Sequence, residues 1–544
     1  MKKIIFILLV SFIFLNFTEE KKTPEKPKLV IGIVVDQMRY DYLTRYYNRF
    51  GNDGFKRLLN EGYSLENAHF NYIPTYTAVG HTSIYTGTTP DHHGIIGNNW
   101  YDKFLKKSIY CVDDFNFTSV GTDSNYGQKS PYRLTTTTVT DQLLLAQNMR
   151  GKSIGIALKD RSAILPVGHT ATAAYWYEGK DKGYFITSSF YRNDLPTWVT
   201  DFNKLQKAQY YTSKPWTTLY DIKTYTNSTT DNSIFEGVFT GEKLPIFPHD
   251  IPNLKKENGN LSIISETPFG NSLTLDFAKA AIVGENLGKN KATDFLAISF
   301  SSTDYVGHKY GVDAVETEDT YLRLDRDLAE LFRFLDENVG KGKYTIFLTA
   351  DHGAIRVPAY LESLRIPAKY FNPQKFKTFL DSVSTKHFKS KELVENFSNY
   401  QLFLDKEKIH SLGLKLDEVS EIFADELVNF ETISKAVTAK TLQKTNFTKG
   451  ILNLLQNGYN QKLSGDVMLI PNPGTISGKR TGTTHGSGFS YDTHVPIIFY
   501  GNGIKKGTSK KRYEITDIAP TIANLLRIEA PNSTTGKIIE EVFK

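Results

Sequence analysis

Five runs of consecutive apolar residues divide this chain, and polar residues follow each run. Continuous runs rich in Val and Ile are typical of strands buried on both faces of a parallel sheet. Between them, apolar residues recur at helical spacing, most clearly over 313–338, where Leu324, Leu328 and Leu331 share one face. Alternating strands and helices predict an α/β fold. The predicted strands are Lys28–Val35, Ser153–Leu158, Phe295–Phe300, Tyr344–Ala350 and Val495–Tyr500.

Two long segments interrupt this alternation, and we predict that both are insertions. Residues 179–261 are rich in Tyr, Thr, Asn, Ser, Lys and Pro and lack long helical periodicity, so we expect them to lie over the active-site face. Residues 356–462 contain only short helical patterns, such as Asp417–Asn429, and predict a second cap region. Residues 514–528 predict a closing helix. One catalytic domain is therefore expected over residues 23–544.

The amino terminus has the pattern of a secretory signal peptide. Two lysines precede the apolar stretch from Ile4 to Leu15, and the polar residues Thr18 to Lys22 follow it. A membrane-spanning helix needs about 20 apolar residues, so this stretch is short, although the lack of a small-x-small cleavage motif leaves an uncleaved anchor as an alternative. We predict a signal peptide over residues 1–22, export to the periplasm or medium, and no stable membrane partner after cleavage.

Composition and charge narrow the classes of partner. The chain has 544 residues, of which 40% are hydrophobic, and its formal net charge is only +6. Its lysines are scattered, so no basic stripe predicts nucleic-acid binding. The single cysteine, Cys111, excludes an internal disulfide and is interpreted as a small packing residue. We expect a monomer.

Potential metal ligands lie at four separated points of the chain, most of them where a predicted strand ends. Asp36 ends the first strand, and Asp351-His352-Gly353 follows the fourth. Because the carboxyl ends of parallel strands meet at one edge of a sheet, these donors can converge on a hard cation. The other candidates are Asp304 and His308, four residues apart after the third strand, and His485 in a glycine-rich loop.

Each candidate also has an ordinary structural interpretation. Asp304 can cap a turn and His308 can lie exposed, and on spacing alone that interpretation is the commoner one. The remaining histidines have no partner at ligand spacing, apart from His81 and His169, which are candidates for supporting the site. Thr77 lies where a loop passes into a predicted helix, where backbone amides favour an anion; its ordinary interpretation is a helix cap.

The motifs that surround these residues make a family resemblance specific. Asp36, the segment TYTAVGHTS around Thr77, TTPDHHGIIGNNW, DYVGH, ADHG and THGS follow one another in the order and spacing of the alkaline phosphatase superfamily, across nearly the whole mature chain. The chain most resembles the phosphate-irrepressible alkaline phosphatase branch, which is similar in core to the nucleotide pyrophosphatase/phosphodiesterases. The resemblance implies a three-layer α/β sandwich with a mostly parallel central sheet and inserted cap segments.

The resemblance also implies a role for each site residue. It implies two zinc ions per chain, one held by Asp304, His308 and His485. The other would be held by Asp36, Asp351 and His352 and would also bind Thr77 as the nucleophile that becomes phosphothreonine. The spacing alone does not prove zinc, because Asp and His ligands also accept manganese or cobalt.

Three further positions follow from the match and concern the substrate. Asn98 would donate its amide to a phosphoryl oxygen, and Lys159 and Arg161 would bring two cations to the same group. Since a phosphate monoester is a dianion, two cations suit it better than a diester monoanion. We therefore predict an alkaline phosphatase acting on small-molecule phosphate monoesters. The alternatives are a phosphodiesterase or nucleotide pyrophosphatase and a catalytically inactive phosphate-binding protein, and a sulfatase fits less well because Ala-Val-Gly follows Thr77.

Overall fold

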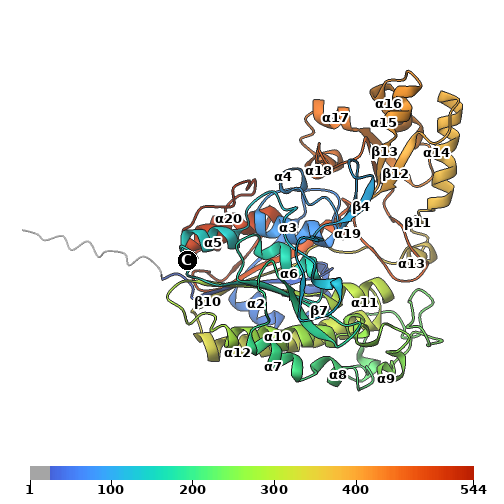
Figure 1. Ribbon diagram of the computed structural model, residues 1–544. Coiled ribbons are helices and arrows are strands. Elements are labelled where there is room, and N and C mark those ends of the chain that lie inside the picture. The colour runs from blue at the N-terminus through green and yellow to red at the C-terminus, as the bar shows by residue number, and fades with distance from the viewer. Residues whose placement is uncertain (1–24) are drawn as a thin grey trace, which may run out of the picture.

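The centre of the molecule is a ten-stranded sheet in the computed structural model, which describes residues 25–544 (Figure 1). The strand order is β18-β2-β17-β10-β1-β9-β6-β7-β8-β5. Strands β10, β1, β9, β6 and β7 run parallel, whereas β17 is antiparallel to β10 and β2, and β8 is antiparallel to β7 and β5. The strands are Leu29–Val35 (β1), Tyr63–His69 (β2), Ser119–Val120 (β5), Ser153–Ala157 (β6), Ala173–Glu178 (β7), Tyr184–Ser188 (β8), Asp294–Phe300 (β9), Tyr344–Thr349 (β10), His494–Gly501 (β17) and Gly507–Glu514 (β18).

Helices cover both faces of this sheet and make the core a three-layer sandwich (Figure 1). Because both faces are covered, every residue of β1, β9 and β10 is buried, which accounts for their uninterrupted apolar runs. The predicted α/β sandwich with a mostly parallel sheet is confirmed. One layer contains α2 (Phe55–Glu61), α10 (Phe269–Gly284) and α12 (Val315–Leu335), and the other contains α3 (Thr77–Thr86), α5 (Val139–Ala146), α6 (Asp160–Val167) and α20 (Ile518–Leu526).

A second structural unit, residues 373–471, projects from the core and is called the cap below (Figure 1, orange). Its four-stranded sheet has the order β12-β13-β15-β14, is antiparallel throughout, and packs its own apolar cluster. Strand β15 lies beyond the limit of 462 predicted for the second insertion. The elements are α14 (Pro373–Phe388), β12 (Val394–Ser398), β13 (Gln401–Leu404), α15 (Lys406–Ser411), α16 (Leu416–Leu427), β14 (Ile433–Thr438), α17 (Ala439–Lys444), α18 (Gly450–Gly458) and β15 (Val467–Pro471).

The segment predicted as the first insertion, 179–261, starts with β8 of the main sheet and continues as short helices and loops. These are α7 (Thr197–Lys204), α8 (Lys207–Tyr211) and α9 (Ile251–Leu254). Trp216 and Phe239 from this segment pack with Val306 and Tyr310 of α11 (Ser302–Tyr310) in one buried cluster. The segment therefore supports α11, the helix that carries Asp304 and His308. Both insertion ranges remain predictions as domain boundaries.

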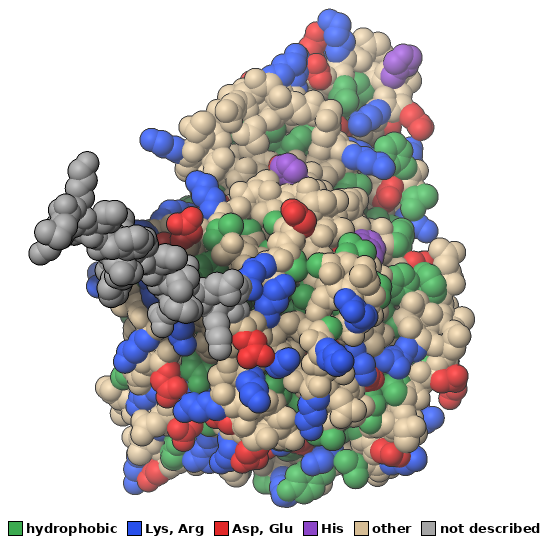
Figure 2. All heavy atoms as spheres, turned by 90° about the vertical axis from the view of Figure 1, so that its left-hand side faces the viewer, with side chains coloured by type: hydrophobic (Ala, Val, Ile, Leu, Met, Phe, Trp, Pro, Cys, Tyr) green, Lys and Arg blue, Asp and Glu red, His purple; other side chains and the backbone are tan. Residues whose placement is uncertain are grey.

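The remaining described elements are short. Strand pairs β3-β4 and β11-β16 lie outside the main sheet. Among residues 25–544, no helix combines the length and apolar character needed to cross a membrane. The predicted signal peptide, residues 1–22, lies outside the described residues, and Cys111 is buried in the core as predicted. On the face drawn in Figure 2, basic and acidic side chains are interspersed. The short elements are α1 (Asp41–Arg45), α4 (Pro90–His93), β3 (Asn99–Asp102), β4 (Lys107–Tyr110), α13 (Pro358–Ser363), β11 (Lys369–Tyr370), β16 (Thr475–Ile476) and α19 (Ser490–Thr493).

Candidate active site

Four adjacent parallel strands end at one edge of the sheet, and the candidate site lies there. Asp36 directly follows β1, and Asp351 lies just beyond β10. Lys159 follows β6, and α11, which carries Asp304, begins shortly after β9. Because these strands are neighbours in the order β10-β1-β9-β6, residues that lie hundreds of positions apart in the chain converge.

The first donor cluster contains Asp36, Asp351 and His352, whose ligand atoms all lie within 4.8 Å of one another. His352 Nε2 is 3.6 Å from Asp36 Oδ1 and 3.4 Å from Asp351 Oδ2. All three side chains are completely buried, and those two carboxylate oxygens accept no hydrogen bond from any described residue. Burial and the neighbouring Asp304 raise the pKa of Asp36 to about 6. Buried carboxylate oxygens that accept no hydrogen bond fit a bound cation.

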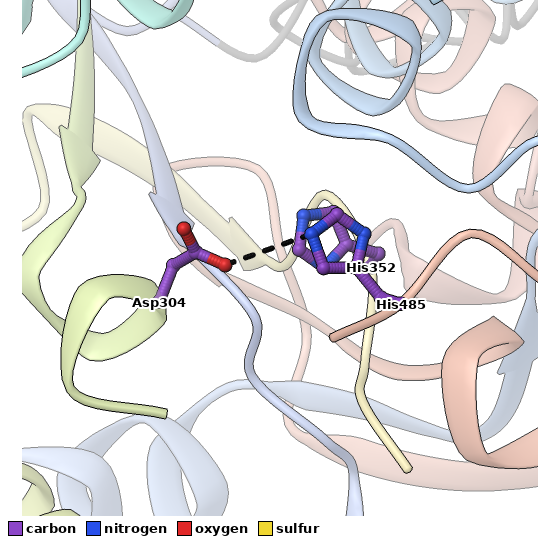
Figure 3. Close-up of side chains that lie close together, drawn as sticks. All are labelled: Asp304, His352 and His485. Atoms are coloured by element: carbon purple, nitrogen blue, oxygen red, sulfur yellow. Dashed lines mark ion pairs between the residues drawn. The ribbon is translucent and has the colours of Figure 1, made fainter. Parts of the chain in front are cut away.

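The second donor cluster surrounds Asp304. Its Oδ1 lies 3.1 Å from His308 Nε2. The same oxygen lies 3.8 Å from His485 Nε2 (Figure 3). A second set of ligand atoms within 4.8 Å of one another belongs to Asp304, His352 and His485. His352 therefore borders both clusters. The rings of His352 and His485 stack, with centroids 3.3 Å apart. The expected triad of Asp304, His308 and His485 remains a prediction, since this geometry groups His352 with Asp304 in place of His308.

Two histidines of the site, His352 and His485, are held in the protonation state that a metal requires, whereas Asp304 raises the pKa of His308 although burial opposes it. Burial lowers the pKa of His485 to about 3 and that of His352 well below its ordinary value, so both imidazoles are neutral. In all three rings Nδ1 faces a backbone carbonyl and Nε2 faces the carboxylates, the arrangement that selects the Nε2 ligand. The carbonyls belong to Thr483 (2.7 Å from His308), Thr75 (2.7 Å from His485) and Gly353 (3.0 Å from His352).

Lys159 and Gln37 connect the two clusters. The Lys159 ammonium donates to Asp36 Oδ2 at 2.6 Å and to Asp304 Oδ2 at 2.5 Å. The side-chain amide of Gln37 donates to Asp304 Oδ1 at 2.6 Å, and its backbone N–H donates to Asp351 Oδ1 at 3.1 Å. Sequence reasoning missed Gln37. Its position directly after Asp36, at the end of a strand, was the available signal.

Thr77 is the first residue of α3, as predicted, and its side chain faces the first cluster. Its Oγ1 is buried and lies 3.4 Å from His352 Nε2. The carbonyl oxygen of the Asn98 side chain accepts the Ala78 N–H at 2.8 Å, so the NH2 group of Asn98 is the part that can donate to a ligand. Helix α3 packs so closely on the loop after β10 that a Cβ atom on Gly80 would lie 2.1 Å from the Asp351 carbonyl oxygen.

Arg161 lies on the first turn of α6 and is held from one side. Its Nη1 donates to Tyr110 Oη at 3.0 Å, while its buried Nε has no hydrogen-bond partner among the described residues. Tyr110, which sequence reasoning did not single out, donates in turn to Asp160 Oδ1 at 2.5 Å. An unpartnered guanidinium N–H in a buried position suits an anionic ligand.

His81 supports the site from behind, one of the two roles expected for it. Its Nδ1 lies 2.9 Å from the Thr77 carbonyl oxygen and 3.4 Å from Asp351 Oδ2, and its Nε2 lies 3.0 Å from Ser299 Oγ. His169, the other candidate, contacts the backbone carbonyl of Leu134 at 3.0 Å. His81 therefore fixes the first turn of α3 relative to the strand ends.

The three-layer α/β fold and the buried carboxylate and imidazole donors at its strand ends define the class, an alkaline-phosphatase-like hydrolase. The model of the type I phosphodiesterase/nucleotide pyrophosphatase family matches residues 30–494, and the chain belongs to this family. Within it, the chain is an enzyme of the alkaline phosphatase type, as the following relatives show.

Three relatives match nearly the whole chain. It is 45% identical to alkaline phosphatase PafA of Elizabethkingia meningoseptica, over 95% of each protein. It is 46% identical to alkaline phosphatase PhoV of Synechococcus elongatus, over 96% of this chain and 94% of that protein. A Myroides odoratus protein named calcium-transporting ATPase is 47% identical over 96% and 95% of the two chains. The crystal structure of wild-type PafA superposes with a TM-score of 0.92 at 44% identity, covering 96% of this chain and all of that one.

Proposed function

We propose that this protein hydrolyses phosphate monoesters in two steps, with Thr77 as the nucleophile and two zinc ions in the site. The observation that carries the proposal is the position of the Thr77 hydroxyl, which is buried at a helix N-terminus and lies 3.4 Å from His352 of the donor clusters. A related structure of PafA carries substitutions at a threonine, an asparagine, a lysine and an arginine, the same four residue types in the same chain order as the four proposed here. Export, predicted from residues 1–22, would place the activity in the periplasm or medium.

The residues proposed to hold the metals have the chemistry that zinc requires. Asp36, Asp351 and His352 would hold one ion, and Asp304, His308 and His485 the other. The orphaned oxygens of Asp36 and Asp351 and the neutral imidazoles of His352 and His485 support this assignment. When bound, zinc would stabilise the negative charge that develops on the attacking and leaving oxygens and would lower the pKa of a water molecule.

The residues of the chain itself would bind and orient the phosphoryl group. The backbone N–H of Thr77, the Asn98 amide and the cations of Lys159 and Arg161 would contact its oxygens. Thr77 Oγ1 would attack phosphorus in line with the leaving alcohol, forming one P–O bond while the ester P–O bond breaks. Water would then cleave the phosphothreonine and release phosphate, which restores the Thr77 hydroxyl.

A second candidate function, phosphodiester or pyrophosphate hydrolysis, follows from the family to which the chain belongs. Two buried cations, Lys159 and Arg161, favour the dianionic monoester over the diester monoanion. The terminal phosphoryl group of ATP carries similar charge, so ATP belongs among the substrates to be assayed, as the name of the Myroides relative also suggests.

The decisive experiment replaces Thr77. Thr77→Ala should lower kcat/KM for phenyl phosphate by about a thousandfold or more, because the attacking oxygen is lost. The matched control is Thr86→Ala, another buried threonine of α3, whose hydroxyl donates to the helix backbone at Thr82 and which should keep near wild-type activity. Substantial activity in Thr77→Ala would contradict the proposed nucleophile. Acid quenching during turnover should trap phosphate on Thr77 in the wild type.

A further inference from the structure

Gln37 lies between the two donor clusters in a backbone conformation that glutamine rarely adopts. The Met38 N–H donates to the Val35 carbonyl at 3.2 Å, so Asp36 and Gln37 are the central residues of a β-turn that directly follows β1. The φ angle of Gln37 is 64°, as at the second central position of a type II turn, where glycine or asparagine is usual. Gln37 is also buried, with 2% of its surface exposed. Strain of this kind persists where the surrounding structure enforces it, and it concentrates at functional sites.

The side-chain amide of Gln37 reaches the carboxylate oxygen that faces two histidines. Its Nε2 donates to Asp304 Oδ1 at 2.6 Å, and the same oxygen faces the Nε2 atoms of His308 and His485. The other oxygen of Asp304 accepts from the Lys159 ammonium. An amide is neutral, so it can fix the direction of a carboxylate without the positive charge that would repel a metal ion.

Helix α11 leaves room for this amide at a glycine. A Cβ atom on Gly307 would lie 2.0 Å from Gln37 Oε1, and the three atoms nearest to that Cβ all belong to the Gln37 side chain. Gly307 lies between Asp304 and His308 on the same helix. Because glycine is less favourable than alanine inside a helix, the space that Gln37 occupies explains a glycine at this position.

The backbone of Gln37 serves the other donor cluster. Its N–H donates to Asp351 Oδ1 at 3.1 Å, while Asp351 Oδ2 accepts no hydrogen bond from any described residue and faces His352. Since this contact uses the main chain, a substitution of the Gln37 side chain leaves it in place. The contributions of Gln37 to the two clusters can therefore be separated.

We propose that Gln37 is a positioning residue for the metal site at Asp304. Its amide holds Asp304 Oδ1 toward His308 and His485 and so raises the affinity of this site for zinc. This inference rests on the proposed function, in which Asp304 holds one of two zinc ions. Removal of a hydrogen bond to a metal ligand typically lowers metal affinity by about 10- to 100-fold, and here the loss should be confined to one ion.

Competition with a chelator measures zinc affinity in the wild type, Gln37→Ala, Gly307→Ala and the double variant. Gln37→Ala should raise the dissociation constant of one zinc ion by about 10- to 100-fold and leave that of the other unchanged. Gly307→Ala should weaken the same ion, because its methyl group displaces the amide. The double variant should bind zinc no more weakly than Gln37→Ala, since the displaced side chain is already gone. Gly307→Ala also keeps the experiment decisive if Gln37→Ala does not fold.

The matched control is Gln401→Ala, which removes another buried glutamine side chain, from β13 in the cap, and should bind both ions like the wild type. The zinc concentration that gives half-maximal hydrolysis of phenyl phosphate should rise in Gln37→Ala together with the dissociation constant. Added zinc should therefore recover activity. A loss of activity that added zinc does not reduce would overturn the positioning role.

Metal analysis of the wild type separates failure of this inference from failure of the proposed function. If the wild type holds two zinc ions and hydrolyses phenyl phosphate, but Gln37→Ala binds both ions normally or loses both equally, the inference is overturned and the proposed function stands. If the wild type holds fewer than two zinc ions, the proposed metal assignment is overturned and the inference with it.

Discussion

At the scale of single residues, Lys159 and Arg161 differ in how they can serve a phosphoryl group. The Lys159 ammonium is engaged by two carboxylates, Asp36 and Asp304. The guanidinium of Arg161 is fixed by Tyr110, while its Nε has no partner among the described residues. Arg161 is therefore the cation most available to the extra negative charge of a monoester, and it should determine the preference for monoesters over diesters.

Replacement of Arg161 tests this division of roles. Arg161→Ala should lower kcat/KM for phenyl phosphate by about 10- to 100-fold, the effect of losing a hydrogen bond between charged groups in a buried site. The loss for methyl phenyl phosphate should be smaller, because this diester lacks the second negative charge. Steady-state kinetics with both esters measure the ratio, and Arg150→Ala provides an exposed arginine as the control. Equal losses for both esters would contradict the role of Arg161 in selecting monoesters.

Some site residues could be predicted from the sequence because they are tied to strand ends. Asp36 and Asp351 follow apolar runs, and the fold makes the ends of those runs neighbours. Tyr110 and His249 could not be predicted in the same way. The partners of His249 lie 7 and 67 positions away in the chain, so no local spacing marks them, and what looked like an ordinary histidine is completely buried.

At the scale of elements, an apolar run predicts a strand but not its direction. The run that became β17 resembles that of β10, yet the two strands pair antiparallel. The polar strands β2 (YSLENAH) and β18 (GTSKKRYE) were not predicted, because neither contains a continuous apolar run. Their pairing in the sheet depends on β17 being present beside β2, which is a tertiary effect.

The junction of α11, α12 and the first insertion contains a buried acidic cluster around His249. The imidazole lies 2.8 Å from Glu242 Oε1 and 3.2 Å from Glu316 Oε1. Although burial opposes the charged ring, these carboxylates raise the pKa of His249 to about 9. Burial, together with repulsion from Glu316, raises the pKa of Glu236 to about 10, and burial raises that of Glu316 to about 7. Asp231, Glu266 and Tyr310 are the other titratable groups near the cluster.

These shifts predict that the junction weakens as pH rises. A group whose pKa is raised by folding stabilises the protein fully below its ordinary pKa, and this contribution is lost as pH rises through the folded value. Each contribution declines between the ordinary and the folded pKa, which is from 6.5 to about 9 for His249, from 4.5 to about 10 for Glu236 and from 4.5 to about 7 for Glu316. In Glu236→Gln the side chain at this position cannot ionise. Between pH 7 and 9 the unfolding free energy of the wild type should therefore fall by about 1 to 3 kcal/mol more than that of the variant.

Denaturant unfolding of the metal-loaded protein at pH 7, 8 and 9 measures this difference. Glu257→Gln, at an exposed position of the same segment, is the matched control and should follow the wild-type curve. Parallel curves for Glu236→Gln and the wild type would show that Glu236 ionises normally and would contradict the prediction.

At the scale of the whole molecule, the fold places three buried carboxylates at one edge of the sheet, and the buried cations of the site do not balance all of their charge. Asp36, Asp304 and Asp351 are all buried at one edge, and Lys159 is the ammonium that bridges two of them. Helices α3 and α11 and the strand ends pack around these three carboxylates. Metal ions should therefore contribute to stability as well as to catalysis.

Metal removal should thus change the effect of a substitution at Asp351. Chelation should lower the unfolding free energy of the wild type by about 4 kcal/mol for each metal site, relative to protein with free metal 1,000-fold above the dissociation constant of that site. In the metal-loaded protein, Asp351→Asn should be destabilising, since it loses a ligand. In the chelated protein the same variant should be more stable than the wild type, because burial already raises the pKa of Asp351 well above its ordinary value and the amide carries no charge. Thermal melts of both proteins with and without chelator measure the reversal, with zinc added back as the control. The same order of stability in both conditions would show that Asp351 does not hold a metal.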